Sequence, residues 1–206
     1  MQQQLFAPAT YALDIPDADI HYYPQFLAEP QSTYQTLLKE IQWRQDTIRI
    51  YGKPLLIPRL NAWYGDREAA YSYSGLTMKP LPWTPCLQAL KQQLETYLNV
   101  QFNSVLLNHY RDGNDSVAWH SDDEPELGTA PIIASLSLGA TRRFSLRSLV
   151  NKTAAPLHID LEPGSLLVMQ GSTQRCWQHQ VAKTTQPTEG RINLTFRRII
   201  GGNAAV

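Results

Sequence analysis

The sequence predicts one α+β domain, a β-sandwich or barrel that is buttressed by helices from its first half. Its 206 residues suit a single domain of ordinary size. The 14 prolines, 11 glycines and 10 tyrosines favour strands and turns over a helical bundle. The hydrophobic periodicity also changes after Phe102, from the spacing of amphipathic helices to that of strands.

Two stretches of the first half have the apolar spacing of helices. In residues 34–41 the apolar positions form one stripe, and Ser32 is the expected N-cap. A second stripe covers residues 87–98, behind Thr84 as N-cap. We expect both helices to pack on one face of a sheet.

The second half alternates short apolar runs with turn signals. We predict strands at residues 104–110, 132–138, 143–149, 157–161, 165–169 and 191–197. Turn sequences separate them, such as Asp-Gly-Asn-Asp at 112–115 and Glu-Pro-Gly at 162–164. Many short strands that follow helices indicate a sandwich or barrel.

Charge and cysteine content limit the partners and the compartment. The 18 basic and 18 acidic residues cancel, so a nucleic acid would have to be held by a local patch. Residues 141–152 hold four basic residues and no acid, although charge alone favours a solvated loop there. Neither a basic leader nor a membrane-spanning apolar run is present, and two cysteines are too few for a disulfide framework. We therefore expect a cytoplasmic protein that does not bind membranes.

The predicted strand at 191–197 alternates polar and apolar residues throughout. One face carries Arg191, Asn193, Thr195 and Arg197, and the other is apolar. Most such strands turn their polar face to water. Two arginines on one face could instead grip a dicarboxylate, because a guanidinium pairs bidentately with a carboxylate.

His120 and Asp122 are two residues apart, and His179 lies far downstream. In extended chain His120 and Asp122 point the same way, so the three could form the two-histidine, one-carboxylate triad of a non-haem Fe(II) site. Such a triad leaves coordination positions open for a co-substrate and O2. For the His-x-Asp pair considered alone, a chance pair on a surface loop is the favoured alternative.

A third pattern, Asn108-His109-Tyr110, places an amide and a phenol on one face of a strand. These groups could hold a small polar ligand, and cross-strand packing explains them equally well. The order of the three patterns is more specific than any one of them.

That order resembles the AlkB family of Fe(II)/2-oxoglutarate-dependent nucleic-acid dealkylases. The motifs that carry the resemblance are Asn-His-Tyr-Arg-Asp at 108–112, Trp-His-Ser-Asp-Asp-Glu-Pro at 119–125, Ser-Leu-Ser-Leu-Gly-Ala-Thr-Arg at 135–142, Trp-Gln-His at 177–179 and Arg-Ile-Asn-Leu-Thr-Phe-Arg at 191–197. The resemblance is greatest to the two eukaryotic DNA-repair homologues, through Pro-Arg-Leu at 58–60, Trp-Tyr-Gly-Asp at 63–66 and Tyr-Ser-Tyr-Ser-Gly-Leu-Thr at 71–77.

The resemblance implies a double-stranded β-helix, or jelly roll, with flanking N-terminal helices. It implies that His120, Asp122 and His179 bind Fe(II). It places Arg191 on the distal carboxylate of 2-oxoglutarate and Arg197 at the end nearer to the metal. The other polar residues expected around the co-substrate are Asn108, Tyr110, Asn193 and Thr195.

The implied activity is DNA repair, in which O2 and 2-oxoglutarate demethylate 1-methyladenine and 3-methylcytosine and release formaldehyde, succinate and CO2. The target base must be single-stranded or flipped out of a duplex. By resemblance the base stacks on Tyr73, opposite His120. The remaining residues expected around it are Arg59, Tyr71, Ser72, Asp123 and Glu124. For the nearby acids Asp112 and Asp115 we expect a solvated loop.

The segment Ile50-Tyr51-Gly52-Lys53 resembles the hairpin finger of the duplex-preferring homologue. Tyr51 would fill the gap left by a flipped base, Gly52 would permit a tight turn, and Lys53 would reach a phosphate. An ordinary hairpin explains the segment equally well.

The resemblance also organises the single domain, residues 1–206, into three regions. These are an N-terminal extension and helix (1–48), a nucleotide-recognition region and helix (49–100) and the jelly-roll core (101–200). The expected partner is alkylated DNA, single- or double-stranded, with RNA as a further candidate, and we expect a monomer. The alternatives are the same oxygenase chemistry on RNA, protein or a small molecule, and a non-enzymatic jelly-roll binding module.

Overall fold

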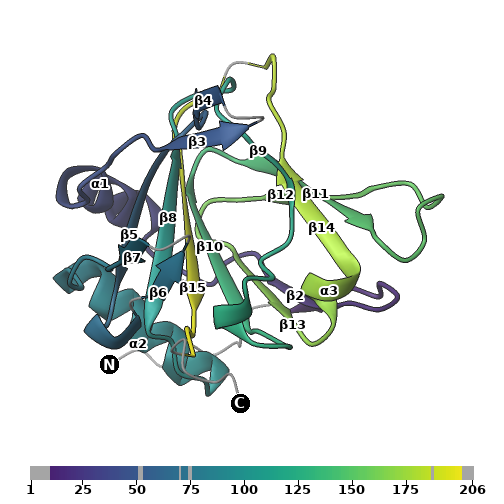
Figure 1. Cartoon of the computed structure of the whole chain (residues 1–206), viewed down its shortest axis with the longest axis horizontal. Helices are drawn as coiled ribbons and strands as arrows, with labels where there is room; N and C mark the ends of the chain where they lie inside the picture. The colour runs from purple at the N-terminus through teal and green to yellow at the C-terminus, as the bar shows by residue number, and fades with distance from the viewer. Residues whose placement is uncertain (1–9, 51–52, 70, 74–75, 187, 201–206) are drawn as a thin grey trace.

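Two antiparallel sheets face each other in the computed structural model, and helices cover the outer face of the larger sheet (Figure 1). The structure describes residues 10–50, 53–69, 71–73, 76–186 and 188–200, and only the course of the backbone at 48–50, 71–73 and 76–78. The arrangement is the jelly roll with flanking helices that the sequence predicts.

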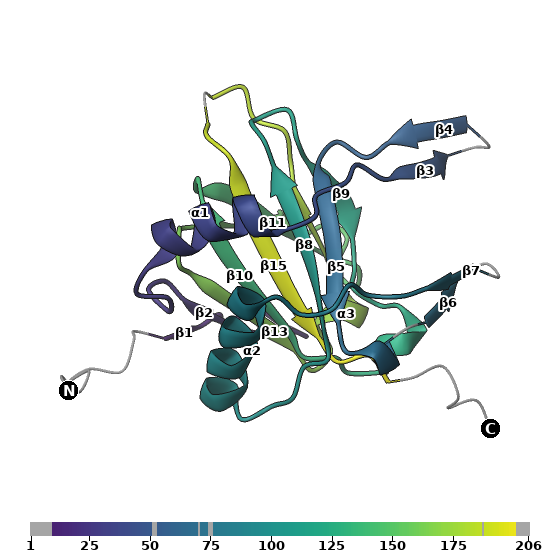
Figure 2. The same ribbon diagram turned by 90° about the vertical axis from the view of Figure 1, so that its left-hand side faces the viewer.

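The seven-stranded sheet contains, in order across it, β1 (Tyr11–Ala12), β2 (Asp19–Tyr23), β13 (Leu166–Gln170), β10 (Ile133–Gly139), β15 (Arg191–Arg197), β8 (Ser104–Tyr110) and β5 (Leu60–Gly65). The four-stranded sheet contains β12 (Leu157–Leu161), β11 (Arg142–Ser148), β14 (Trp177–Val181) and β9 (Val117–His120). Two hairpins stand apart from these sheets: β3 (Thr47–Ile50) with β4 (Lys53–Leu56), and β6 (Tyr71–Tyr73) with β7 (Leu76–Met78). Figure 2 shows both hairpins extending from the same side of the body.

The helices are α1 (Pro30–Glu40), α2 (Pro85–Leu98) and the single turn α3 (Thr173–Cys176), with 3-10 turns η1 (Arg67–Ala69) and η2 (Pro125–Leu127). The Thr84 cap is confirmed, because its hydroxyl accepts the Leu87 backbone N–H at 3.3 Å. The Ser32 cap is wrong: α1 begins at Pro30, whose fixed φ suits the first helical position, and Glu29 is its N-cap. No helix among the described residues is long and apolar enough to cross a membrane.

All six predicted strands are present, each displaced by one residue at most. The strands that were not predicted include β2, β9, β14 and β5. In β5 the buried and half-buried positions do not alternate. Tertiary pairing forms these strands: β2 pairs with β13, and β5 pairs with β8.

Two hydrophobic cores lie on opposite faces of the seven-stranded sheet. One is enclosed by α1 and α2, and Ile192, Leu194 and Phe196 of β15 are fully buried in it. The other lies between the two sheets. Because the polar face of β15 turns toward the second space, Arg191 is 1% exposed and Thr195 is 6% exposed. The usual expectation that such a face meets water therefore fails here.

Part of the basic segment 141–152 is also buried. Arg142 is 4% exposed, and its guanidinium donates to the backbone carbonyls of Asp112, Asp115 and Ala182 at 3.0, 3.0 and 2.7 Å. This arginine therefore ties together three chain segments, whereas Arg143, which follows it on β11, is exposed.

Candidate active site

Two imidazoles and a carboxylate meet inside the jelly roll. His120 ends β9, Asp122 follows two residues later, and His179 on β14 stands opposite His120 in the sheet register. One ligand atom from each of the three lies within 4.8 Å of the others, so the group could hold a metal ion.

Neighbouring groups orient these side chains. The Nδ1–H of His120 donates to the Ala118 carbonyl at 2.8 Å, which leaves Nε2 with its lone pair free for a metal. The His179 ring stacks on Phe144, with centroids 5.1 Å apart. The Asp122 carboxylate accepts from Nη2 of Arg197 at 3.0 Å.

The protonation states also suit a metal. Burial lowers the pKa of His179 to about 4, and Asp122 only partly offsets this effect, so the imidazole is neutral at pH 7. Burial alone would raise the pKa of Asp122, but the positive charge of Arg197 and the contributions of His179 and His120 outweigh it, and the net shift is downward. Both groups are therefore in the form that ligates a cation.

Arg191 is a buried cation with unused donors. Its Nη2 donates to the Ser137 hydroxyl at 2.9 Å, while Nε and Nη1 have no hydrogen-bond partner among the described residues. The guanidinium lies 5.3 Å from the centre of the Tyr110 ring, and burial lowers its pKa. Unpartnered buried donors are costly, so this fork fits a bound carboxylate.

The remaining polar residues predicted for the co-substrate form a ladder across β10, β15 and β8. The Asn193 amide donates to the Ser135 hydroxyl at 2.8 Å, and the Thr195 hydroxyl donates to the Asn193 carbonyl oxygen at 3.3 Å. Asn108 pairs with Asn193 in register, and its Oδ1 accepts from Nε of Arg59 at 2.7 Å.

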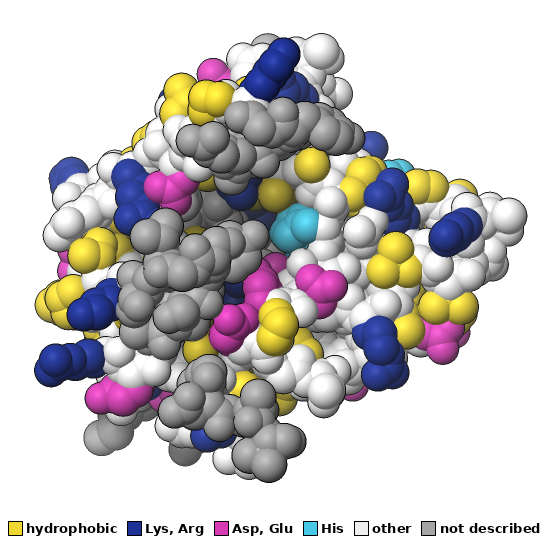
Figure 3. Space-filling view, viewed as in Figure 1, with side chains coloured by type: hydrophobic (Ala, Val, Ile, Leu, Met, Phe, Trp, Pro, Cys, Tyr) yellow, Lys and Arg dark blue, Asp and Glu magenta, His cyan; other side chains and the backbone are white. Residues whose placement is uncertain are grey.

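One cavity of about 680 Å³ collects these groups. Of the residues predicted for the site, those that line it are His120, Asp122, His179, Asn108, Tyr110, Arg191, Asn193, Thr195, Arg197, Arg59 and Glu124. Figure 3 shows acidic side chains beside a histidine at the centre of one face of the molecule, with lysines and arginines toward its rim.

The other predicted substrate residues are not placed in this cavity. Asp123 and Lys53 are exposed and do not line it. Tyr71, Ser72 and Tyr73 form β6, of which only the backbone is described, and Tyr51 and Gly52 lie outside the described residues.

The solvated-loop expectation is wrong for Asp115, which is 4% exposed. Its two oxygens accept from the Arg111 guanidinium at 2.7 and 2.9 Å. Burial would raise its pKa, but these bonds outweigh burial and lower it. Asp112 is exposed, as expected, and caps the Asn114 backbone N–H.

Sequence reasoning gave no role to Ser135 and Ser137, whose hydroxyls accept from the Asn193 amide and the Arg191 guanidinium. Their Ser-x-Ser spacing is a usable signal, because it places both hydroxyls on one face of a strand. Phe144 and Gln174 were also missed, and nothing in the local sequence distinguishes them from ordinary core residues.

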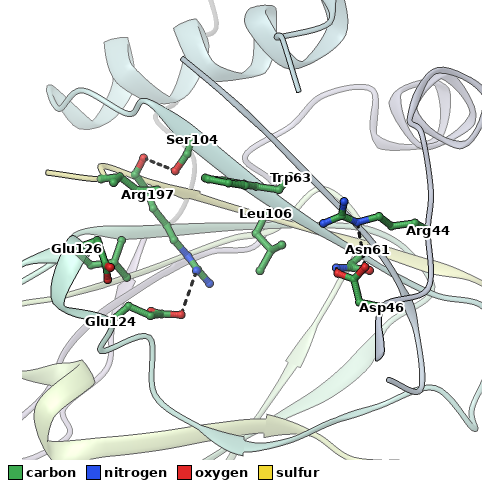
Figure 4. Close-up of a pocket in the computed structure, with 11 residues that line it drawn as sticks. Arg44, Asp46, Asn61, Trp63, Ser104, Leu106, Glu124, Glu126 and Arg197 are labelled. Atoms are coloured by element: carbon green, nitrogen blue, oxygen red, sulfur yellow. Dashed lines mark hydrogen bonds and ion pairs between the residues drawn. The ribbon is translucent and has the colours of Figure 1, made fainter. Parts of the chain in front are cut away.

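A smaller pocket of about 120 Å³ adjoins the main cavity and shares Leu106, Glu124 and Arg197 with it. Figure 4 shows Arg197 directed toward Glu124, and the Arg197 Nη1 atom is 3.9 Å from the Glu124 carboxylate. Trp63 covers one wall of this pocket, and Asp46 lies at its far side.

Facing sheets that enclose two histidines, a carboxylate and an arginine with free donors define a non-haem iron oxygenase. Residues 19–197 match the 2OG-Fe(II) oxygenase superfamily. The chain belongs to this family, whose members require Fe(II), 2-oxoglutarate and O2. The donor set fits both groups: the His-Asp-His cluster suits the metal, and the orphaned donors of Arg191 suit the dicarboxylate.

The chain is also similar in sequence to named dioxygenases. The chain is 46% identical over 185 residues to the bovine (Bos taurus) alpha-ketoglutarate-dependent dioxygenase alkB homolog 3, covering 84% of this chain and 63% of the relative. To the human (Homo sapiens) DNA oxidative demethylase ALKBH2 it is 36% identical over 182 residues, covering 84% and 70%. The chain thus spans less than two thirds of the bovine relative's length.

A solved structure also shares the fold. The structure of OsALKBH1 superposes with a TM-score of 0.63 at 16% identity, covering 87% of this chain and 96% of the other. The predicted jelly-roll class is confirmed.

Proposed function

We propose that this chain is an oxidative demethylase of alkylated nucleic-acid bases, with DNA as its main substrate. The observation that carries the proposal is one cavity that contains both the His120, Asp122 and His179 cluster and the unpartnered donors of Arg191. Relatives whose names include "DNA oxidative demethylase" support the choice of substrate.

In this proposal His120, Asp122 and His179 hold Fe(II). Arg191 takes the distal carboxylate of 2-oxoglutarate, and Arg197 lies at the end nearer to the metal. Asn108, Tyr110, Asn193 and Thr195 complete the polar wall around the co-substrate. When bound, iron and 2-oxoglutarate supply the oxidation of the N-methyl carbon by O2, with succinate and CO2 as by-products. The hydroxylated methyl group then leaves the base as formaldehyde.

The protein contributes orientation and a shaped environment. The Arg191 fork would fix one end of the dicarboxylate, since its position is set by the Ser137 hydroxyl and the Tyr110 ring. Phe144 and Met169 line the same cavity, and their apolar side chains would limit the water around a bound substrate.

The cavity entrance suits a cationic base. Glu124 lines the cavity, so a positively charged 1-methyladenine or 3-methylcytosine would meet its carboxylate. We propose that Asp123, which precedes it in the chain and is exposed, also faces the base. Arg59 lines the pocket wall, and we propose that Tyr71, Ser72 and Tyr73 cover the base. Such a base must be unpaired or flipped to enter.

The β3–β4 hairpin supports contact with a nucleic-acid chain. Leu55 is 52% exposed and also lines the cavity, and the exposed Lys53 begins the same strand. We propose that Tyr51, Gly52 and Lys53 form a finger that contacts duplex DNA. We also propose that the protein is one domain over residues 1–206, acts as a monomer, and works in the cytoplasm.

A second candidate is the same oxygenase chemistry on RNA, a protein or a small molecule. The zero net charge favours it, because a protein that binds long polyanions generally carries a basic surface.

The test is direct. Metal-free protein is loaded with Fe(II) without oxygen, given 2-oxoglutarate and air, and incubated with oligonucleotides that carry 1-methyladenine or 3-methylcytosine. DNA and RNA, single- and double-stranded, are compared by mass spectrometry. We expect loss of the methyl group from DNA together with succinate. Succinate formed without demethylation of any oligonucleotide, or no succinate with any oligonucleotide, would refute a nucleic-acid substrate.

A further inference from the structure

A buried glutamine contacts the segment that carries Asp122. Gln174 is 3% exposed and lies in the single turn α3. Its Oε1 accepts the backbone N–H of Asp122 at 2.9 Å, and its Nε2 lies 3.5 Å from the sulfur of Met169. Because a backbone N–H can only donate, this bond fixes which end of the amide faces Asp122.

The turn that carries Gln174 is anchored to the larger sheet. The Thr173 hydroxyl accepts the Asp19 backbone N–H at 2.9 Å and donates to the Gln170 carbonyl at 2.6 Å. The Trp177 indole N–H donates to the Pro16 carbonyl at 3.0 Å. Residues on β2 and β13 therefore hold α3 in place.

This anchoring matters because the three clustered side chains come from different supports. His120 and His179 belong to the four-stranded sheet, in direct register. Asp122 lies beyond the end of β9, so no strand pairing fixes its backbone. Gln174 holds that backbone, and Arg197 of β15 holds the carboxylate at 3.0 Å. Arg197 comes from the seven-stranded sheet and Gln174 from the turn between β13 and β14, while the Ser121 hydroxyl donates to the Trp177 carbonyl of β14 at 3.0 Å. Of these contacts, only the bond from Gln174 holds the Asp122 backbone N–H.

We propose that Gln174 is a positioning residue that holds Asp122 in its metal-binding geometry before the metal arrives. This proposal rests on the proposed role of Asp122 as an Fe(II) ligand. Partners that orient metal ligands commonly change metal affinity by about 10–100-fold when they are removed. Without Gln174, the buried N–H of Asp122 loses its acceptor and the segment loses its tie to α3.

The first experiment measures metal binding directly. Metal-free protein is titrated with Co(II), which reports the ligand geometry through its visible absorption. Gln174→Leu keeps the approximate size of the side chain but removes the acceptor. We expect its Co(II) dissociation constant to rise roughly 10–100-fold, with an altered visible spectrum. Wild-type affinity together with a wild-type spectrum would overturn the proposal.

Gln170→Leu is the matched control. Gln170 ends β13 four residues earlier, and its amide donates to the Asp19 carboxylate at 3.0 Å in an exposed contact. The same substitution there should leave Co(II) affinity and spectrum unchanged. An equal loss in both variants would show that the effect comes from general loosening near α3 and would contradict the specific role of Gln174.

A second measurement uses the unaltered protein and does not depend on how the variants fold. In metal-free protein the Asp122 amide proton should exchange as slowly as amides within β14, because Gln174 already binds it. Fast exchange that slows only after Co(II) is added would show that the metal orders this segment, and the proposal would fail.

Asp122→Ala in the same titration separates this proposal from the one on which it rests. If Asp122→Ala abolishes Co(II) binding while Gln174→Leu has no effect, only the positioning role is wrong. If Asp122→Ala itself binds Co(II) normally, the metal-site assignment is wrong, and the proposed role of Gln174 is then wrong as well.

Discussion

At the residue scale, the candidate site combines buried charges that offset one another with a few that lack partners. Asp122 is held by Arg197 and faces two imidazoles, so its negative charge is compensated within the protein. Arg191 has only neutral neighbours among its direct contacts, a hydroxyl and an aromatic ring. A buried cation of this kind is stable only if an anion or solvent meets its free donors. The difference between these two buried charges indicates that an anionic ligand is needed at Arg191.

The role of Asp122 predicts the behaviour of its alanine variant. Asp122→Ala leaves two neutral imidazoles for a dication, so we expect turnover to be abolished and Fe(II) binding to weaken strongly. Succinate formation and metal titration measure the two effects. Asp160→Ala is the control, because the exposed Asp160 carboxylate forms an ion pair with exposed Arg143. Turnover near the wild-type value in Asp122→Ala would remove the triad assignment.

Arg191 predicts a selective effect on the co-substrate. Arg191→Lys keeps a positive charge but removes the planar fork. We expect the KM for 2-oxoglutarate to rise about 10–100-fold, because the variant loses a hydrogen bond to a charged group. Steady-state succinate assays over a range of 2-oxoglutarate concentrations measure it. Arg143→Lys on β11 is the exposed control and should not change the KM. An unchanged KM in Arg191→Lys would show that another residue binds the distal carboxylate.

At the element scale, β15 shows how one alternating strand serves two purposes. Its position between β10 and β8 puts Ile192, Leu194 and Phe196 under the helices. The same pleat puts Arg191 and Arg197 in the cavity, on the face opposite to those apolar residues. A slip of one residue in register would exchange these faces, so the apolar core also fixes the geometry of the site.

The β3–β4 hairpin gives a prediction about strand preference. Tyr51 lies outside the described residues, between two strands that pair from Thr47 with Leu56 to Ile50 with Lys53. If Tyr51 fills the gap that a flipped base leaves, Tyr51→Ala should lower repair of double-stranded substrate much more than repair of single-stranded substrate, because only a duplex has this gap. The two rates are compared by mass spectrometry at equal substrate concentration. Equal losses on both substrates, or no loss on either, would show that Tyr51 is not a finger.

Strand β2 predicts that the N-terminal region belongs to the same folding unit as the core. Ile20 is 1% exposed and pairs, through its strand, with Met169 of β13. Ile20→Ala should lower the free energy of unfolding by roughly 2–5 kcal/mol and keep one transition. Urea unfolding followed by circular dichroism and tryptophan fluorescence measures this, with the partly exposed neighbour His21→Ala as control. Separate transitions would mean that residues 1–48 fold independently.

At the scale of the whole molecule, the features predicted from the sequence are those that show as hydrophobic periodicity or as the spacing of a motif. The six predicted strands of the second half and the two amphipathic helices are present, and the three side chains of the His-Asp-His pattern lie together. The β9 strand was missed because four residues give too short a pattern. The β14 strand was missed because polar Gln178, His179 and Gln180 interrupt its apolar residues. Gln174 was overlooked because its partner Asp122 is distant in sequence. Asp115 was misjudged because its loop is held in the fold by Arg142 of β11, although its ion-pair partner Arg111 is only four residues away.

The free energy of unfolding of the metal-free protein should depend on pH through His179. His179 has a pKa of about 4 in the folded state, against about 6.5 in an unfolded chain. As the pH falls below about 6.5, the unfolded chain binds a proton that the folded protein rejects until about pH 4, so the free energy of unfolding falls across this window. At roughly 1.4 kcal/mol per pKa unit, the loss reaches up to about 3 kcal/mol. The lowered pKa of Asp122 adds a loss of the same sign at still lower pH.

Urea unfolding at about pH 7.5 and about pH 4.5 measures this effect. Between these two values, the free energy of unfolding should fall more for the wild type than for His179→Gln. An identical drop in both proteins would mean that His179 is not the group responsible.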